Sequence, residues 1–188
     1  ILVLEKEASI YNLPRAVHFD DEVMRVFNTI GITKSLTKKL IINKGTKFVD
    51  EKGNLLLDWP RPKVITENGW YPSYRFHQPD LERSLRHKLK KFEKVIISQN
   101  SEVYKTISHK NYSIIQYKNL KTKQIFSVKS KYVIGCDGAN SFLRKQIKSE
   151  MEHLGFEQRW AVIDLILKTK KTNLPDRTIQ YCNSKRPA

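Results

Sequence analysis

The chain has 188 residues and a formal net charge of +16 at pH 7, and its length suits one ordinary domain or two small ones. An apolar fraction of 39% with 10% aromatic residues indicates a globular protein and argues against a disordered one. The lysines are scattered rather than interleaved with aromatic residues in one stretch, so we interpret them as solvated faces and expect no nucleic-acid partner.

The cysteines, histidines and apolar runs argue against several other classes. Cys136 and Cys182 lie far apart and the five histidines have no metal-ligand spacing, so we expect no disulfide framework, no metal and a cytoplasmic location. The sequence has no run of eighteen apolar residues and no signal peptide, so we expect no membrane span. The chain opens with ILVLE and no initiator Met, which predicts an internal fragment of a longer protein.

The hydrophobic pattern alternates between strands and helices along the chain. Residues 1–5 are a continuous apolar run that ends in an acid, which is typical of a buried strand. Residues 19–31 have acids near the start, where a helix favours them, and Val23, Phe27 and Ile30 supply an apolar stripe. The later predicted elements are a hairpin over 46–59, a helix over 78–92, an antiparallel meander over 102–107, 112–118 and 124–129, a buried strand over 132–137, a helix from about Ser141, and strands over 160–167 and 178–182.

Two of these strands indicate a dinucleotide-binding α/β layer. Residues 1–5 and 132–136 both lead toward a helix, as parallel strands of such a layer do. Glu5 stands at a strand tip, where a carboxylate accepts hydrogen bonds from ribose hydroxyls, although an ordinary strand-end acid explains it equally well. The turn at 136–140 is built of small residues, so phosphates or a ribose could approach its backbone. None of the seven glycines forms a glycine-rich phosphate loop.

Five motifs carry a resemblance to a known family. CDGANSFLR resembles the Asp-Gly motif of the class A flavoprotein monooxygenases, which have the p-hydroxybenzoate hydroxylase fold. Four further motifs are similar, in order and spacing, to the 3-(3-hydroxyphenyl)propionate hydroxylase branch of this family. They are LPRAVHFDDEVMR, FHQPDLERSLR, LGFEQRWAVIDL and QYCNSKRP. The resemblance spans nearly the whole chain.

The resemblance implies roles for three residues in the first half of the chain. Glu5 would bind the adenosine ribose of FAD. Arg15 would contact FAD and help to position the reduced nicotinamide, whereas a surface arginine in a loop is the alternative. Gln78 would hydrogen-bond the ribityl region of the flavin, and capping of its own helix is the alternative or an additional role.

Three further residues belong to the Asp-Gly motif. The resemblance implies that Asp137 and Gly138 line the cofactor through a tight turn. Arg144 would hold Asp137 or a phosphate by paired donors, and the ion pair with Asp137 is the favoured alternative. No catalytic residue is assigned.

The resemblance implies an α/β fold with an incomplete Rossmann-like layer that binds FAD and an interleaved β-rich substrate domain. NADH or NADPH would be the co-substrate. Residues 1–43 and 76–150 would form the FAD-binding part, and 44–75 and 151–188 a truncated substrate part. The parent enzyme would hydroxylate a phenolic aromatic acid with O₂, and could be a homo-oligomer. We expect the fragment alone to be inactive.

Two alternatives stay open. One is another flavoprotein of the same fold, a halogenase or a reductase, against which the GFEQRWAVIDL match counts. The other is a basic, non-enzymatic binding module, which only the net charge suggests.

Overall fold

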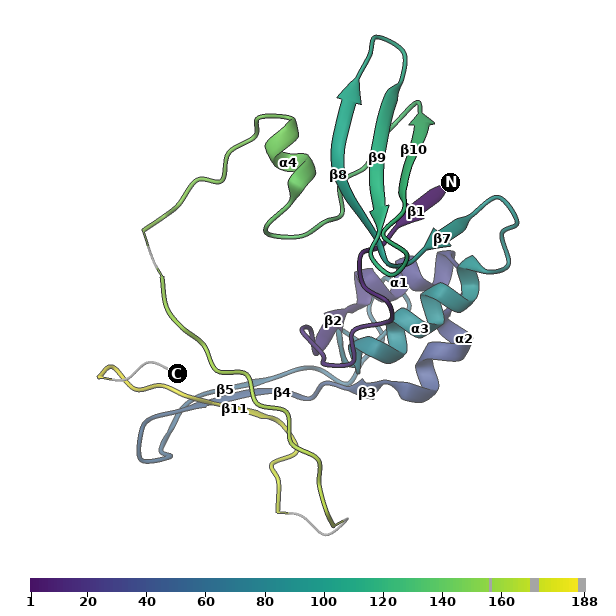
Figure 1. The fold of residues 1–188 in the computed structure, drawn as a ribbon. Coiled ribbons are helices and arrows are strands. Elements are labelled where there is room, and N and C mark those ends of the chain that lie inside the picture. The colour runs from purple at the N-terminus through teal and green to yellow at the C-terminus, as the bar shows by residue number, and fades with distance from the viewer. Residues whose placement is uncertain (156, 170–172, 186–188) are drawn as a thin grey trace. The chain divides into compact units, whose positions relative to one another are not determined.

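The computed structural model describes residues 1–155, 157–169 and 173–185, and it combines helices with four small sheets (Figure 1). The chain divides into two compact units. The first unit comprises Ile1–Ser9 and Glu93–Ile166, and the second comprises Ile10–Phe92 and Leu167–Ala188. These two units are defined by how compactly their residues pack, not by function. The division into a cofactor-binding part and a substrate part stays a prediction.

The first unit contains a parallel strand pair and an antiparallel meander, and the meander confirms the prediction for that region. β1 pairs in parallel with β7, and the meander has the order β10-β9-β8. The elements of this unit are β1 (Leu2–Leu4), β7 (Ile96–Ser98), β8 (Ser101–Ser108), β9 (Ser113–Asn119), β10 (Ile125–Ser130) and α4 (Phe142–Gln146). The strand predicted at 1–5 is confirmed, but Leu2 and Val3 are exposed rather than buried.

Two apolar runs predicted as strands, 132–137 and 160–167, form no strand in the described structure. Ile134 is 82% exposed and Ile166 is 96% exposed. The expectation that 132–136 and β1 are parallel strands of one layer is also wrong, because 132–136 forms no strand and β7 is the partner of β1 in the described structure. A buried strand needs partners for its backbone groups and a cover for its side chains, and an apolar run by itself supplies neither.

The second unit contains two three-stranded sheets with the orders β2-β6-β3 and β11-β4-β5. The pairs β2–β6, β3–β6 and β4–β5 are antiparallel, whereas β11 runs parallel to β4. The elements of this unit are β2 (His18–Asp20), α1 (Asp21–Thr29), α2 (Thr33–Leu36), the 3₁₀ helix η1 (Thr37–Lys39), β3 (Ile41–Ile42), β4 (Gly45–Val49), β5 (Leu55–Pro60), β6 (Ser73–Arg75), α3 (Gln78–Leu89) and β11 (Thr178–Tyr181).

Helix α1 confirms the predicted helix and part of its predicted apolar face. It begins at Asp21 because the Asp20 carboxylate caps it by accepting a hydrogen bond from the Val23 backbone N–H at 3.0 Å. Met24 is fully buried and Phe27 of the predicted stripe packs against the core, whereas Val23 and Ile30 are exposed. The buried face of α1 therefore includes Met24 as well as Phe27, and the predicted stripe includes only Phe27 of these two.

The core of the second unit joins β2, β6, α1 and α2, and α3 packs against it. Its buried apolar side chains are Phe19, Met24, Ile32, Leu36 and Tyr74. From α3, Leu81 and Leu85 pack against this cluster, as the four-residue spacing of leucines predicts.

The predicted hairpin and the predicted last strand are both present as β4–β5 and β11. A Cβ at Gly45 would lie 2.2 Å from the Trp59 carbonyl oxygen, so only glycine allows the strands to meet there. β11 is tied to this sheet by ion pairs just before the strand: Lys44 with Asp176 at 3.1 Å, and Arg177 with Asp58 through both carboxylate oxygens.

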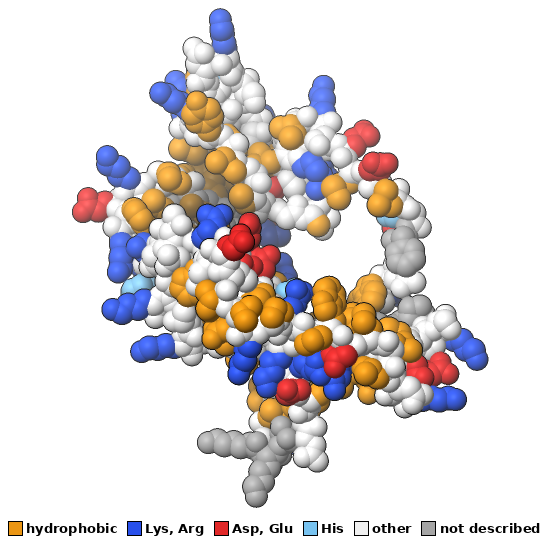
Figure 2. All heavy atoms as spheres, turned by 180° about the vertical axis from the view of Figure 1, so that it is seen from behind, with side chains coloured by type: hydrophobic (Ala, Val, Ile, Leu, Met, Phe, Trp, Pro, Cys, Tyr) orange, Lys and Arg blue, Asp and Glu red, His pale blue; other side chains and the backbone are white. Residues whose placement is uncertain are grey.

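The surface has no single basic face in the view of Figure 2, where lysine and arginine side chains alternate with acidic and hydrophobic ones. This matches their scatter in the sequence. Within the described ranges, none of the helices has the length and apolar character to cross a membrane.

Candidate cofactor-binding site

Gln78 is the first residue of α3, and its side chain reaches back to a distant segment. The Gln78 Oε1 atom accepts hydrogen bonds from the backbone N–H groups of Arg15 at 2.7 Å and of Ala16 at 3.0 Å. His77 is the N-cap residue of α3 and makes no side-chain capping bond. The capping role considered for Gln78 is therefore wrong: its oxygen anchors another segment.

The orientation of the Gln78 amide follows from its two partners. Two backbone N–H groups need an acceptor, so the amide oxygen faces them and the NH₂ group faces away. No described residue accepts a hydrogen bond from this NH₂ group. Gln78 thus presents two donors on the side opposite the anchored segment.

Arg15 is exposed, yet its side chain has a definite position. Its guanidinium carbon lies 4.4 Å from the centre of the Tyr11 ring, in a cation–π contact. Because Gln78 holds the backbone of the same residue, Arg15 is fixed at two points. The structure thus brings together Arg15 and Gln78, two of the predicted site residues.

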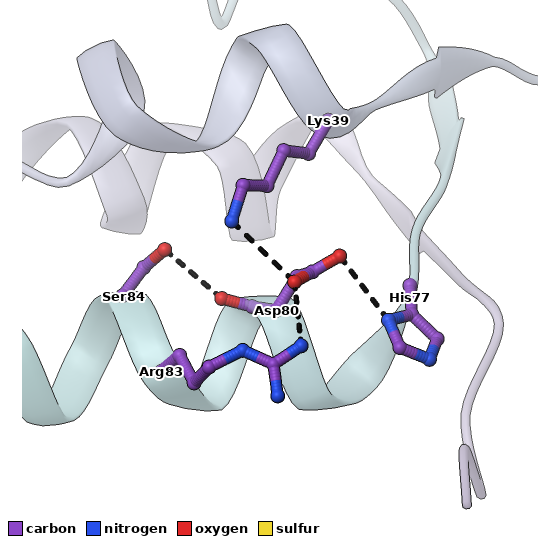
Figure 3. A network of polar contacts seen from close by, with 5 residues as sticks. All are labelled: Lys39, His77, Asp80, Arg83 and Ser84. Atoms are coloured by element: carbon purple, nitrogen blue, oxygen red, sulfur yellow. Dashed lines mark hydrogen bonds and ion pairs between the residues drawn. The ribbon is translucent and has the colours of Figure 1, made fainter. Parts of the chain in front are cut away.

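A charged network is centred on Asp80 in the first turn of α3, two residues after Gln78 (Figure 3). Asp80 Oδ1 accepts hydrogen bonds from Arg83 at 2.7 Å and from Lys39 at 3.4 Å, and Oδ2 lies 3.1 Å from His77 Nδ1. Lys39 ends η1, so the network ties η1 to the start of α3. The Arg83 hydrogen bond, aided by His77 and Lys39, lowers the pKa of Asp80 to about 2.

Sequence reasoning missed this network, although one signal was available. Asp80 lies in the first turn of α3, where the helix dipole favours an anion, and Arg83 follows at a spacing of three residues. Lys39 is 41 residues away in sequence, and no local pattern indicates that it lies there.

Asp137 organises the start of α4. Its Oδ1 atom accepts a hydrogen bond from the Ser141 hydroxyl at 2.5 Å, and its Oδ2 atom accepts one from the Leu143 backbone N–H at 3.1 Å. Ser141 in turn accepts a hydrogen bond from the Arg144 backbone N–H at 2.9 Å. The Ser141 hydroxyl, helped by backbone N–H groups at the helix start, lowers the pKa of Asp137.

The predicted ion pair between Arg144 and Asp137 is wrong. Both Asp137 oxygens accept hydrogen bonds from Ser141 and Leu143, and Arg144 joins the network through its backbone rather than its guanidinium. Local capping competes well with an ion pair, because it orders fewer rotatable bonds.

The backbone conformation at position 138 favours glycine. Its φ angle is +77°, in the left-handed region, and a Cβ there would meet no atom within 4 Å. At Gly135, in contrast, neighbouring atoms leave little room for a side chain, because a Cβ there would lie 3.0 Å from the Cβ of Leu143. The described residues therefore leave open space beside Gly138, and its contact with the cofactor stays a prediction.

Glu5 lies at the carboxyl end of β1, as the sequence indicates. Its backbone N–H donates to Ser98 at 2.9 Å, and its carbonyl oxygen accepts from Ser101 at 2.8 Å. One side-chain oxygen accepts from the Glu7 backbone N–H at 2.9 Å. The strand tip is thus well anchored, while one carboxylate oxygen is engaged by its own chain.

The six predicted residues fall into two groups. Arg15 and Gln78 contact each other in the second unit, and Glu5, Asp137, Gly138 and Arg144 belong to the first unit. Of the motifs that carry the resemblance, Phe156, Arg186 and Pro187 lie outside the described residues. Among the described residues, no group of three or more His, Cys, Asp or Glu could hold a metal ion.

Comparison with known proteins places the chain among flavin-binding proteins. The family model described as "FAD binding domain" matches residues 1–186. A probable NADH-specific resorcinol 4-hydroxylase of Rhodococcus jostii is 29% identical over 100% of this chain and 35% of its own length. A 3-(3-hydroxy-phenyl)propionate/3-hydroxycinnamic acid hydroxylase of Burkholderia vietnamiensis is 28% identical over 99% of this chain and 33% of its own length.

Solved structures show the same fold. p-Nitrophenol 4-monooxygenase from Pseudomonas putida matches with a TM-score of 0.70 and 20% identity, over 78% of this chain and 36% of that one. The flavin-dependent monooxygenase PieE, solved with FAD and substrate, matches with a TM-score of 0.68 and 16% identity, over 78% of this chain and 27% of that one. The chain spans about a third of the length of the curated relatives it matches. It belongs to the FAD binding domain family.

Proposed function

We propose that the chain is part of an FAD-dependent monooxygenase that hydroxylates a phenolic aromatic acid with NADH or NADPH and O₂. The names of the two curated relatives describe hydroxylases of phenolic compounds, and one describes NADH specificity. FAD, when bound, supplies the redox chemistry that activates O₂, while the protein orients the ring and excludes water.

The strongest support is the contact between Arg15 and Gln78. These residues come from separate motifs of the resemblance, 63 residues apart, and the fold joins them directly. A donor pair on Gln78 and a cation on Arg15 suit a ligand rich in hydroxyl, carbonyl and phosphate oxygens. This donor set fits FAD and a reduced nicotinamide.

We assign a role to each predicted residue. The Gln78 NH₂ group donates to the ribityl region of the flavin, and Arg15 positions the reduced nicotinamide. Glu5 accepts hydrogen bonds from the adenosine ribose. Asp137 and Gly138 line the cofactor with the open backbone of their turn.

Arg144 is assigned to a phosphate of the cofactor. This alternative remains because Arg144 forms no ion pair with Asp137. None of the described residues bonds to its guanidinium, and its backbone N–H donates to Ser141.

We also propose that the chain contributes to two functional parts of the enzyme. Residues 1–43 and 76–150 bind FAD, and 44–75 and 151–188 contribute to the substrate part. We place the enzyme in the cytoplasm, where exposed thiols such as Cys136 and Cys182 stay reduced. Assembly into a homo-oligomer is compatible with this function.

The test uses the full-length protein that contains this chain. Purified protein should carry FAD, and a phenolic acid should accelerate NADH or NADPH oxidation and yield a product one oxygen atom heavier. Resorcinol and 3-(3-hydroxyphenyl)propionate are the first substrates to try, in buffers with and without chloride. A chlorinated product would identify a halogenase. Nicotinamide oxidation that reduces an added substrate, with no consumption of O₂ and no hydroxylated product, would identify a reductase.

A further inference from the structure

Tyr11 and Arg15 contact each other within a segment that is neither helix nor strand. The contact therefore does not follow from regular helical spacing. It forms because the chain bends between the two residues while Gln78 anchors the backbone at Arg15 and Ala16. Tyr11 is 47% exposed, so its ring contributes little to the core of the unit.

The geometry leaves Arg15 able to bind a ligand. A guanidinium group is planar, and its N–H donors point outward in that plane. An aromatic ring that covers one face leaves these donors available while it restricts the motion of a long side chain. Tyr11 thus fixes the direction of a cation without neutralising it.

We infer that Tyr11 is a positioning residue for Arg15, acting through its aromatic ring. The inference rests on the proposed function, in which Arg15 positions the reduced nicotinamide for hydride transfer to FAD. Gln78 and Tyr11 then have separate tasks: Gln78 fixes the backbone of Arg15 and Tyr11 fixes its side chain.

The ring, not the hydroxyl group, is the important part of Tyr11. Within the described part of the chain, the Tyr11 hydroxyl group has no hydrogen-bond partner, whereas the ring lies under the Arg15 guanidinium. Tyr11→Phe should therefore preserve the function of the residue, and Tyr11→Leu should remove it.

The chain provides an internal control. Arg61 stacks on Trp59 in the same unit, with its guanidinium carbon 4.8 Å from the ring centre. Changes at Tyr11 should alter the behaviour of Arg15 and leave that of Arg61 unchanged.

The first experiment needs no enzyme activity. The full-length protein and its variants are treated with phenylglyoxal, which modifies guanidinium groups, and modification of Arg15 and Arg61 is followed by peptide mass spectrometry. A cation–π contact at an exposed site corresponds to about a two- to five-fold effect. Arg15 should react about two- to five-fold faster in Tyr11→Leu than in the wild type or Tyr11→Phe, and Arg61 equally in all three. Equal rates at Arg15 would overturn the inference.

The second experiment measures flavin reduction by NADH or NADPH in a stopped-flow instrument. Tyr11→Leu should slow reduction about two- to five-fold with unchanged FAD affinity, and Tyr11→Phe should match the wild type. In an Arg15→Ala background, Tyr11→Leu should have no further effect, because the two residues act as one unit. Additive losses, or a loss in Tyr11→Phe equal to that in Tyr11→Leu, would show that the ring does not act through Arg15.

The two experiments separate this inference from the proposed function. If neither nicotinamide reduces the flavin, the proposed function fails, and the phenylglyoxal result still decides whether Tyr11 holds Arg15.

Discussion

The side-chain oxygen of Gln78 accepts a hydrogen bond from the backbone N–H of Arg15 at 2.7 Å, and this bond joins residues 63 positions apart. It connects the start of α3 to a segment that has no helix or strand of its own. The same bond orients the Gln78 NH₂ group away from the segment. One side chain therefore both anchors the loop and presents donors to the proposed cofactor.

Substitution of Gln78 should separate these two tasks. Gln78→Glu keeps an oxygen for the two backbone N–H groups but loses the outward NH₂ donors, so the free energy of unfolding should change little while FAD affinity falls about ten-fold. Gln78→Met removes both functions and should in addition destabilise the protein by about 0.5–1.5 kcal/mol. Urea unfolding and FAD titration measure the two effects. Equal destabilisation by both variants would mean that the oxygen does not hold the loop.

Asp80 should make stability depend on acid pH. Its pKa of about 2 lies below the ordinary 3.8, so its ion pairs stabilise the fold above about pH 4, and this contribution is lost as pH falls from about 4 to about 2. Asp80→Asn should lower the free energy of unfolding at pH 7 by about 1–2 kcal/mol and reduce its pH dependence in that window.

The control for this prediction is Asp176→Asn, which breaks the ion pair with Lys44. The Asp176 side chain is 66% exposed, against 26% for Asp80, so solvent screens its pair more strongly and the change should be smaller. If the two variants have equal effects at every pH, the Asp80 network is only an ordinary surface ion pair.

Asp137 should determine the order of α4. Asp137→Ala removes the acceptor of the Ser141 hydroxyl and the Leu143 backbone N–H, so amide hydrogen exchange at Leu143 and Arg144 should speed up about five-fold. Asp164→Ala, at an exposed position outside helices and strands, should leave these rates unchanged. Because the pKa of Asp137 is lowered, the cap should persist at pH 3.8 and weaken only at lower pH.

Arg15 should matter more for flavin reduction than for FAD binding. A cation there can position a reduced nicotinamide, but it adds little to an extensive dinucleotide site. Arg15→Ala should therefore slow reduction by NADH or NADPH about ten-fold or more and change FAD affinity less. Arg61→Ala is the matched control, since Arg61 also stacks on an aromatic ring. Reduction of the Arg15→Ala enzyme at the wild-type rate would remove Arg15 from the site.

Elements with local signals could be predicted from the sequence. Asp20 and the acids after it mark the start of α1, and Asp50 marks the turn between β4 and β5, where its side chain accepts hydrogen bonds from Lys52 and Asn54. In the meander, alternating side chains identify β8, β9 and β10. All of these signals lie within a few residues of the structure they specify.

Features that depend on distant residues could not be predicted in this way. Residues 132–137 have the composition of a buried strand but no partner strand in the described structure. Lys39 meets Asp80 only because η1 packs near α3. The Gln78–Arg15 bond joins separate motifs, so the family resemblance named both residues but the fold revealed their contact.

The most direct test of the proposed hydroxylase is the origin of the oxygen atom in its product. The full-length enzyme is supplied with NADH, a phenolic acid and ¹⁸O₂ in ordinary water, and the product is analysed by mass spectrometry. One ¹⁸O atom per new hydroxyl group is expected, because a monooxygenase takes that atom from O₂. A product that carries only oxygen from water, or no hydroxylated product from an enzyme loaded with FAD, would rule out this function.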